Sequence, residues 1–222
     1  MRYEIFGSNL PAVTIYLDAG ESIFTQSGGM TWMTDDLKME TNAKGGFGRM
    51  FAGESIFMAT YTAQSPNQSM TLASTFPGSI IPLELAPGKE YIIQKSAFLC
   101  AQPQVQLTTE IIKGLSGGFF GGEGFVLQRL KGSGLAFLEI DGSVREIELK
   151  AGEKLKVDTG NVAIYESSVT YGVERIKGFK NVLFGGEGLF LTTVTGPGKV
   201  WLQTMTIPGF AKIIYPFLPK SN

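Results

Sequence analysis

The stretch VREIELKAGEKLKVDTGNVAIYE, at Val144–Glu166, decides the fold class. Apolar residues take every second position in it, a period typical of strands that bury one face. The turn-forming groups AGE and DTGN separate the apolar runs. The stretch therefore predicts three short strands joined by tight turns. The alternating apolar residues are Ile147 and Leu149, then Leu155 and Val157, then Val162 and Ile164.

The turn glycine of this stretch, Gly152, has two counterparts along the chain. Gly20 lies in DAGESIFTQSGGMTWM and Gly88 lies in APGKEYIIQKSAFLCA. The glycines are 68 and then 64 residues apart. This spacing indicates an internal repeat, because a fixed period is the signature of a duplicated structural unit.

A second landmark, K-G-x5-F-[AG]-G-E, repeats with almost the same spacing. Its phenylalanines are 69 and then 64 residues apart. Two landmarks with matching periods predict three copies of a unit of about 65 residues. The motif residues are Lys44, Gly45, Phe51, Gly53 and Glu54, then Lys113, Gly114, Phe120, Gly122 and Glu123, then Lys177, Gly178, Phe184, Gly186 and Glu187.

These patterns predict a single all-β domain over residues 1–222. Its repeats are expected at 1–84, 85–149 and 150–207, followed by a tail at 208–222. The strands after the glutamate motifs are expected to form hairpins with KGSG and GPG as turns. A single unit of this size would leave strand edges exposed. Fusion of the units and oligomerisation are therefore expected, because both cover such edges.

Composition excludes several kinds of chemistry. The chain has no histidine, which removes Ser-His-Asp and Cys-His catalysis and nearly all zinc sites. Its single cysteine, Cys100, lies in the apolar run SAFLCAQ and is interpreted as a core residue. The net charge of −1 gives no field that would draw the chain to nucleic acid or anionic lipid.

Targeting signals are not expected in this chain. The first residues, MRYEIFGSNL, lack the apolar core of a signal peptide. No run approaches about 18 apolar residues, the length of a membrane-spanning helix. The sequence therefore predicts a protein of the cytoplasm without a transmembrane segment.

The repeated glutamates Glu54, Glu123 and Glu187 are interpreted as structural. A carboxylate is a good acceptor for the N–H groups of a glycine-rich turn, and a repeated residue is by default part of a repeated scaffold. Acid/base catalysis or metal binding is the alternative. The motif phenylalanines are expected to fill the core. The motif lysines are expected to be solvated or paired with acids, with a ring that holds an anion as the alternative.

Three further groups are weighed as binding sites. The segment KGGFGRMFAGES fits neither common glycine-rich nucleotide motif. Asp35, Asp36 and Glu40 lie close enough for calcium but lack the spacing of an EF-hand loop, so a polar turn is expected. Trp32 and Trp201 lie in strand-like runs and could stack bases, although the basic residues are scattered rather than striped.

The tail MTIPGFAKIIYPFLPKSN carries an apolar stripe at helical spacing, and Pro216 should limit its helix to about one or two turns. It is expected to pack on the chain's own sheet. Contact with a partner subunit and contact with a membrane surface are the alternatives. The stripe consists of Phe210, Ile213, Ile214, Phe217 and Leu218.

Several segments resemble the bacterial branch of a known family. They include FAGESIF, PGSIIPLEL, SAFLCA, FFGGEGFVLQRLKGSGLAFLEIDG, LKAGEKLKVDTGNVAIYESSVTY and LFGGEGLFLTTVTGPGKVWLQT. The family is the mitochondrial biogenesis family, named in yeast for altered inheritance of mitochondria, number twenty-four, and formerly a domain of unknown function. The resemblance covers nearly the whole chain.

This resemblance implies a β-sandwich of the double-stranded β-helix group, similar to the tryptophan RNA-binding attenuator protein (TRAP-like). It also implies a homotrimer. The family has no accepted enzymatic activity, so the resemblance implies no catalytic, cofactor-binding or metal-binding residues. Its mitochondrial members act in membrane organisation, a role not expected here without a targeting segment.

The sequence favours a non-catalytic, self-assembling scaffold or interaction protein. A module that binds a small molecule or single-stranded nucleic acid is the alternative, and an enzyme that uses carboxylates alone comes third. The scaffold interpretation predicts that Glu123→Gln and Glu187→Gln each cost about 1–3 kcal/mol of stability, because backbone N–H groups lose their acceptor.

Overall fold

Antiparallel strands make up almost all of the fold, as the sequence predicts. The structure, a computed structural model, describes residues 1–26, 28–41, 58–111, 126–175 and 190–219. The all-β class is confirmed, and the sheets form a β-sandwich. In chain order the strands are β1 (Arg2–Phe6), β2 (Ala12–Leu17), β3 (Ser22–Gln26), β4 (Trp32–Met33), β5 (Leu37–Thr41), β6 (Met58–Ala63), β7 (Gln68–Ala73), β8 (Gly78–Leu85), β9 (Tyr91–Gln94), β10 (Phe98–Ala101), β11 (Val105–Ile111), β12 (Val126–Gly132), β13 (Gly134–Asp141), β14 (Val144–Leu149), β15 (Lys154–Asp158), β16 (Val162–Glu166), β17 (Thr170–Arg175), β18 (Phe190–Thr195) and β19 (Gly198–Gln203).

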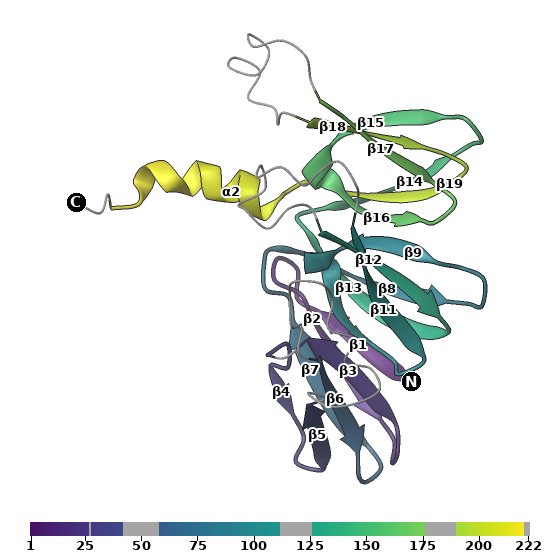
Figure 1. Ribbon diagram of the computed structural model, residues 1–222. Helices are drawn as coiled ribbons and strands as arrows, with labels where there is room; N and C mark the ends of the chain where they lie inside the picture. Colours follow the sequence, from purple (N-terminus) through teal and green to yellow (C-terminus); the bar gives the residue numbers. More distant parts are fainter. Residues whose placement is uncertain (27, 42–57, 112–125, 176–189, 220–222) are drawn as a thin grey trace.

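The described strands form four sheets, of which two are large. One six-stranded sheet has the order β5-β6-β3-β10-β13-β8, and the other has the order β11-β12-β9-β16-β19-β14. Smaller sheets close the series, β1-β2-β7-β4 near the N-terminus and β15-β18-β17 near the C-terminal part. Figure 1 shows the purple N-terminal strands at one end of the molecule and the green strands β15, β17 and β18 at the other.

The same strand pairings recur along the chain. The strand before each turn glycine pairs with a later strand, as in β2–β7, β8–β13 and β14–β19. That later strand also pairs with a third one, as in β4–β7, β10–β13 and β16–β19. The remaining strands form the triplets β3-β6-β5, β9-β12-β11 and β15-β18-β17. Each set of six strands therefore contains one turn glycine, between its first strand and its second. The number of sequence repeats, their boundaries and the TRAP-like class stay predictions.

The turn glycines adopt one conformation. Gly20, Gly88 and Gly152 have φ of 83°, 83° and 77°. Most residues avoid this left-handed region because their Cβ is crowded there, whereas glycine enters it without penalty. KGSG and GPG do connect consecutive strands, β12 to β13 and β18 to β19, but the expected hairpins are wrong, because the strands on either side of each turn belong to different sheets and do not pair with each other. The turn chemistry thus explains where many of the strands begin.

Apolar side chains from several sheets form three buried clusters. The largest joins strands of both six-stranded sheets, with Phe98, Leu138 and Ile164 among its members. The predicted alternation is confirmed in β14 and β15, where Leu149 is buried and Leu155 is half-buried between exposed neighbours. The alternation is wrong in β16. That strand is buried on both faces from Val162 to Tyr165, because Ala163 and Ile164 pack in the largest apolar cluster while Val162 and Tyr165 pack in another.

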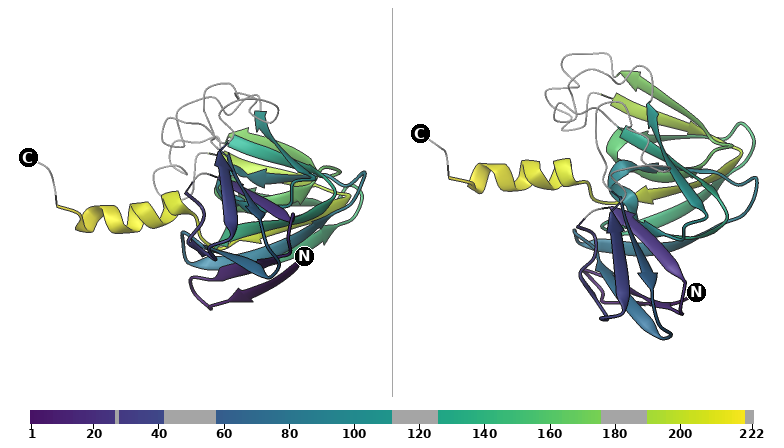
Figure 2. Two further views of the ribbon diagram at one scale, coloured as in Figure 1. Left: turned by 90° about the horizontal axis from the view of Figure 1, so that it is seen from below. Right: turned by 60° about the horizontal axis from the view of Figure 1, so that its bottom comes forward.

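Helical structure is confined to short segments in the described ranges. The 3-10 turns η1 (Lys95–Ala97) and η2 (Thr159–Asn161) connect β9 to β10 and β15 to β16. The α-helix α2 (Ile207–Ile214) and the 3-10 turn η3 (Tyr215–Phe217) form the tail. The predicted length of about one or two turns for the tail helix is confirmed. Both views of Figure 2 show α2 projecting away from the sheets.

Candidate interaction surfaces

The repeated glutamate motif lies outside the described residues. All fifteen motif positions fall within 42–57, 112–125 or 176–189, so their roles stay predictions. The described strands on either side of each range pair with each other: β5 with β6, β11 with β12, and β17 with β18. The motifs therefore occupy matching places in the strand order.

Two glutamates within the described ranges accept hydrogen bonds from backbone N–H groups of glycine turns, which is the role predicted for the motif glutamates. The Glu21 carboxylate accepts a hydrogen bond from the Asp18 N–H at 2.8 Å, and Glu153 accepts one from the Lys150 N–H at 2.9 Å. Both belong to the A-G-E turn, and Lys89 stands at the matching place after Gly88. Sequence analysis missed these residues, although the repeated A-G-E group carried the signal.

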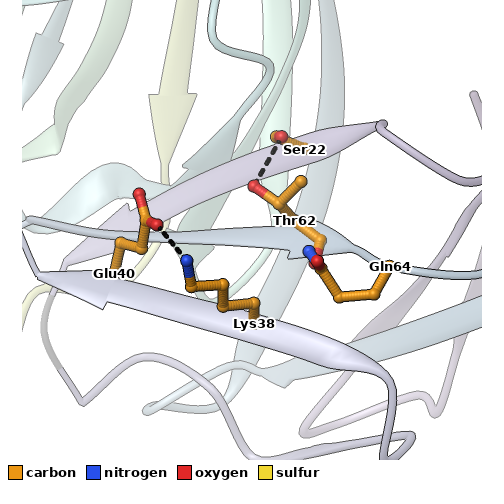
Figure 3. A network of polar contacts seen from close by, with 5 residues as sticks. All are labelled: Ser22, Lys38, Glu40, Thr62 and Gln64. Atoms are coloured by element: carbon orange, nitrogen blue, oxygen red, sulfur yellow. Dashed lines mark hydrogen bonds and ion pairs between the residues drawn. The ribbon is translucent and has the colours of Figure 1, made fainter.

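The acidic residues Asp35 and Asp36 before β5 and Glu40 within it do not gather into a cation site. Asp35 and Asp36 lie in a turn, as predicted, and the Asp36 carboxylate accepts a hydrogen bond from the Ser65 hydroxyl at 2.7 Å. Glu40 instead pairs with Lys38 at 2.9 Å (Figure 3). Hydrogen bonding to Glu40 raises the pKa of the exposed Lys38 ammonium. Within the described ranges, no three acidic or thiol groups lie close enough to hold a metal.

Two residues singled out in the sequence belong to the core. Cys100 is fully buried, and its desolvation raises the pKa of the thiol, which keeps it protonated. The core prediction is confirmed. Trp201 is also buried and meets Tyr91 edge to face at 6.0 Å between ring centroids. Neither side chain is placed to meet a ligand at the surface.

Strand pairing joins the successive sets of strands into large sheets. β3 pairs with β10, with Thr25 opposite Cys100. β9 pairs with β16 in the same way, with Ile93 opposite Ile164. Side chains reinforce these joints, since the Thr25 hydroxyl donates to the Leu99 carbonyl at 2.6 Å. Backbone pairing is therefore completed between adjacent sets of strands, which protects both edges.

Each of the two terminal sheets has one edge strand, β4 or β15, whose counterparts elsewhere in the described chain are paired on both sides. Among the described strands, β4 pairs only with β7 and β15 pairs only with β18. β4 exposes two large apolar residues, with Trp32 53% and Met33 36% exposed. Trp32 contacts Phe6 of β1, at 6.4 Å between ring centroids. The β4 and β15 edges lie at opposite ends of the molecule (Figure 1).

The C-terminal tail is the other exposed apolar surface. No residue of α2 or η3 is buried. Phe76 meets Phe210 edge to face at 5.1 Å between ring centroids near the helix start, but the helix then leaves the body (Figure 2). The prediction that the tail packs on the chain's own sheet is wrong, because its eight-residue helix is directed away from the strands. None of the helices in the described ranges has the length and hydropathy needed to span a bilayer.

Asp141 anchors the start of this helix. It is half-buried at the end of β13, and its carboxylate accepts a hydrogen bond from the Ile207 N–H. Burial raises the pKa of the Asp141 carboxyl, with a further increase from Glu139, and the bond to Ile207 opposes both. A polar anchor thus holds the base of an apolar helix.

The fold defines a class of all-β proteins built from stacked antiparallel sheets. The chain belongs to the family described as mitochondrial biogenesis AIM24, whose sequence profile matches residues 3–205. It is 29% identical to uncharacterized protein M6_Spy0233 of Streptococcus pyogenes serotype M6, over 100% of this chain and 93% of that protein. The crystal structure of protein SPYM3_0169 from Streptococcus pyogenes is also similar, with a TM-score of 0.80 and 28% identity over 98% of this chain and 99% of that one. The resemblance seen in the sequence is confirmed.

Proposed function

We propose that the protein is a non-catalytic, self-assembling β scaffold. The observation that carries this proposal is the tail, where seven large apolar residues are exposed in one short segment. Extended apolar patches are rare on soluble proteins and mark surfaces that other molecules cover. The residues are Ile207, Phe210, Ile213, Ile214, Tyr215, Phe217 and Leu218.

The position of the tail supports the same proposal. A helix that projects from the body while its base is fixed by Asp141 can reach a second molecule without disturbing the sheets. Water contact with its apolar side chains is unfavourable, and a neighbouring protein surface removes that contact. The finer parts of the proposal, a homotrimer and a location in the cytoplasm, come from the family resemblance and from the composition.

The test is the mass of the purified chain, measured by light scattering during size exclusion at micromolar concentration. The scaffold proposal expects an assembly, with a trimer at three times the chain mass of 24.0 kDa. A strict monomer at every concentration contradicts self-assembly. An assembly of another number retains the scaffold role and overturns the trimer.

A further inference from the structure

Two of the edge strands, β15 and β4, correspond to the two sides of the internal joints. At each internal joint, the strand that follows one turn glycine pairs with the second strand after the next turn glycine. β15 is the strand that follows the last of the three glycines, and β4 is the second strand after the first one. β15 and β4 are therefore the two joint-forming strands that have no joint partner within the described chain.

The sequence positions at these edges match those at the joints. Cys100 and Ala101 lie twelve and thirteen residues after Gly88, and Ile164 and Tyr165 lie at the same distances after Gly152. All four side chains are buried at the internal joints. The residues at the same distances after Gly20 are Trp32 and Met33, which are exposed. The difference follows from pairing, since β10 and β16 are flanked on both sides whereas β4 has β7 as its one partner among the described strands.

We propose that β15 of one copy of this chain pairs with β4 of a second copy, which repeats the internal joint between molecules. This inference rests on the proposed self-assembly and names the surface that carries it. The contact is heterologous, because different edges meet, and successive contacts either close a ring or extend a filament. The joined sheet has the order β17-β18-β15-β4-β7-β2-β1, which continues the pattern of the two six-stranded sheets.

The internal joints also fix the register of the proposed contact. Ile164 lies opposite Ile93, and Tyr165 lies opposite Ile92. Cys100 and Ala101 lie opposite Thr25 and Phe24. The corresponding positions in β15, counted from Gly152, are Val157 and Lys156. Trp32 of one copy is therefore placed opposite Val157 of the next, and Met33 is placed opposite Lys156.

Disulfide trapping tests this register. Met33→Cys and Lys156→Cys are made in separate chains, mixed and oxidised, because directly opposed strand positions bring Cβ atoms within reach of a disulfide. We expect a cross-linked dimer from the mixture and none from either variant alone. Lys154→Cys, two residues away on the same face of β15, is the control and should trap at least tenfold less. Equal trapping by Lys156→Cys and Lys154→Cys, or none by either, overturns the register.

A second variant pair separates this inference from the scaffold proposal. Trp32→Glu should weaken assembly at least tenfold in light scattering, whereas Met39→Glu, which changes a similarly exposed residue of β5, should leave it unchanged. If the wild type assembles and neither trapping nor Trp32→Glu has an effect, the β15–β4 contact is wrong and the scaffold proposal stands. If the wild type is a strict monomer, both fail. A chain that carries both cysteines and closes on itself, at monomer mass, also overturns contact with a second copy.

Discussion

Glutamate carboxylates beside turn glycines stabilise this fold at the residue scale. Glu21 and Glu153 each accept a backbone N–H three residues earlier, in turns that place glycine at positive φ. A charged acceptor makes such a bond stronger than a neutral one. The same chemistry was predicted for Glu123 and its counterparts, which remain outside the described residues.

Glu153→Ala is expected to lower the free energy of unfolding by about 1 kcal/mol, because the Lys150 N–H loses a charged acceptor. Urea denaturation monitored by circular dichroism measures this change. Glu84→Ala, at an exposed position of β8, is the matched control and should change stability by less than about 0.5 kcal/mol. Equal effects of the two variants would remove the structural role of the turn carboxylate.

Asp141→Asn tests the half-buried anchor of α2. Burial raises the pKa of Asp141 above its ordinary value of 3.8, so the folded chain binds the proton more tightly than the unfolded chain. The stability that this group contributes is therefore present below pH 3.8 and lost as the pH rises through the raised value. Asparagine removes the charge and keeps an acceptor for Ile207. We expect the variant to be more stable than the wild type at pH 7, with a difference that shrinks towards pH 4. A difference that does not depend on pH contradicts this account.

Close approach between neighbouring strands decides which glycines are required at the element scale. A Cβ added at Gly78, at the start of β8, would lie 1.9 Å from the Ile140 carbonyl oxygen of β13. A Cβ at Gly152 meets nothing within 4 Å and is disfavoured only by its positive φ. The two glycines therefore serve different purposes, strand contact in one and turn conformation in the other.

Gly78→Ala is expected to cost about 2–3 kcal/mol because β8 must move away from β13. Gly152→Ala is the comparison and should cost about 1 kcal/mol from backbone strain alone. Thermal unfolding of the two variants under the same conditions measures the order. If Gly152→Ala is the more damaging change, the strand contact at Gly78 is less important than the geometry indicates.

The exposed apolar tail can be tested with a single charged substitution. Phe217→Asp places a charge on the most exposed large apolar residue of η3. The scaffold proposal expects weaker assembly in light scattering with an unchanged melting temperature, because this side chain is exposed within the chain. Leu10→Asp, at an exposed apolar position outside the tail, is the control and should leave the mass distribution unchanged.

The sequence predicted elements well where they depend on local patterns. Alternation located β14 and β15, and the glycine-rich groups located the turns. β16 departed from alternation because distant parts of the chain cover both of its faces, and one strand's own pattern does not reveal what packs on it. The direction of α2 was mispredicted for a similar reason. An apolar stripe indicates that a helix needs cover, but it does not identify the surface that covers it.

At the scale of the whole molecule, the chain is an open series of similar strand sets. Its inner joints, β3–β10 and β9–β16, are sealed by backbone pairing and buried side chains. Its ends present β4 and β15, which match the two sides of those joints. The open ends and the apolar tail both favour a protein that works as part of an assembly.

Hydrogen–deuterium exchange at two protein concentrations shows whether β4 of one copy and β15 of another cover each other. Backbone amides exchange slowly when strand pairing removes them from water. We expect amides of β4 and β15 to be protected when the chain is assembled and to lose protection on dilution, while those of β9 and β16 stay protected throughout. Rapid exchange in β4 and β15 in a sample shown to be assembled would contradict it.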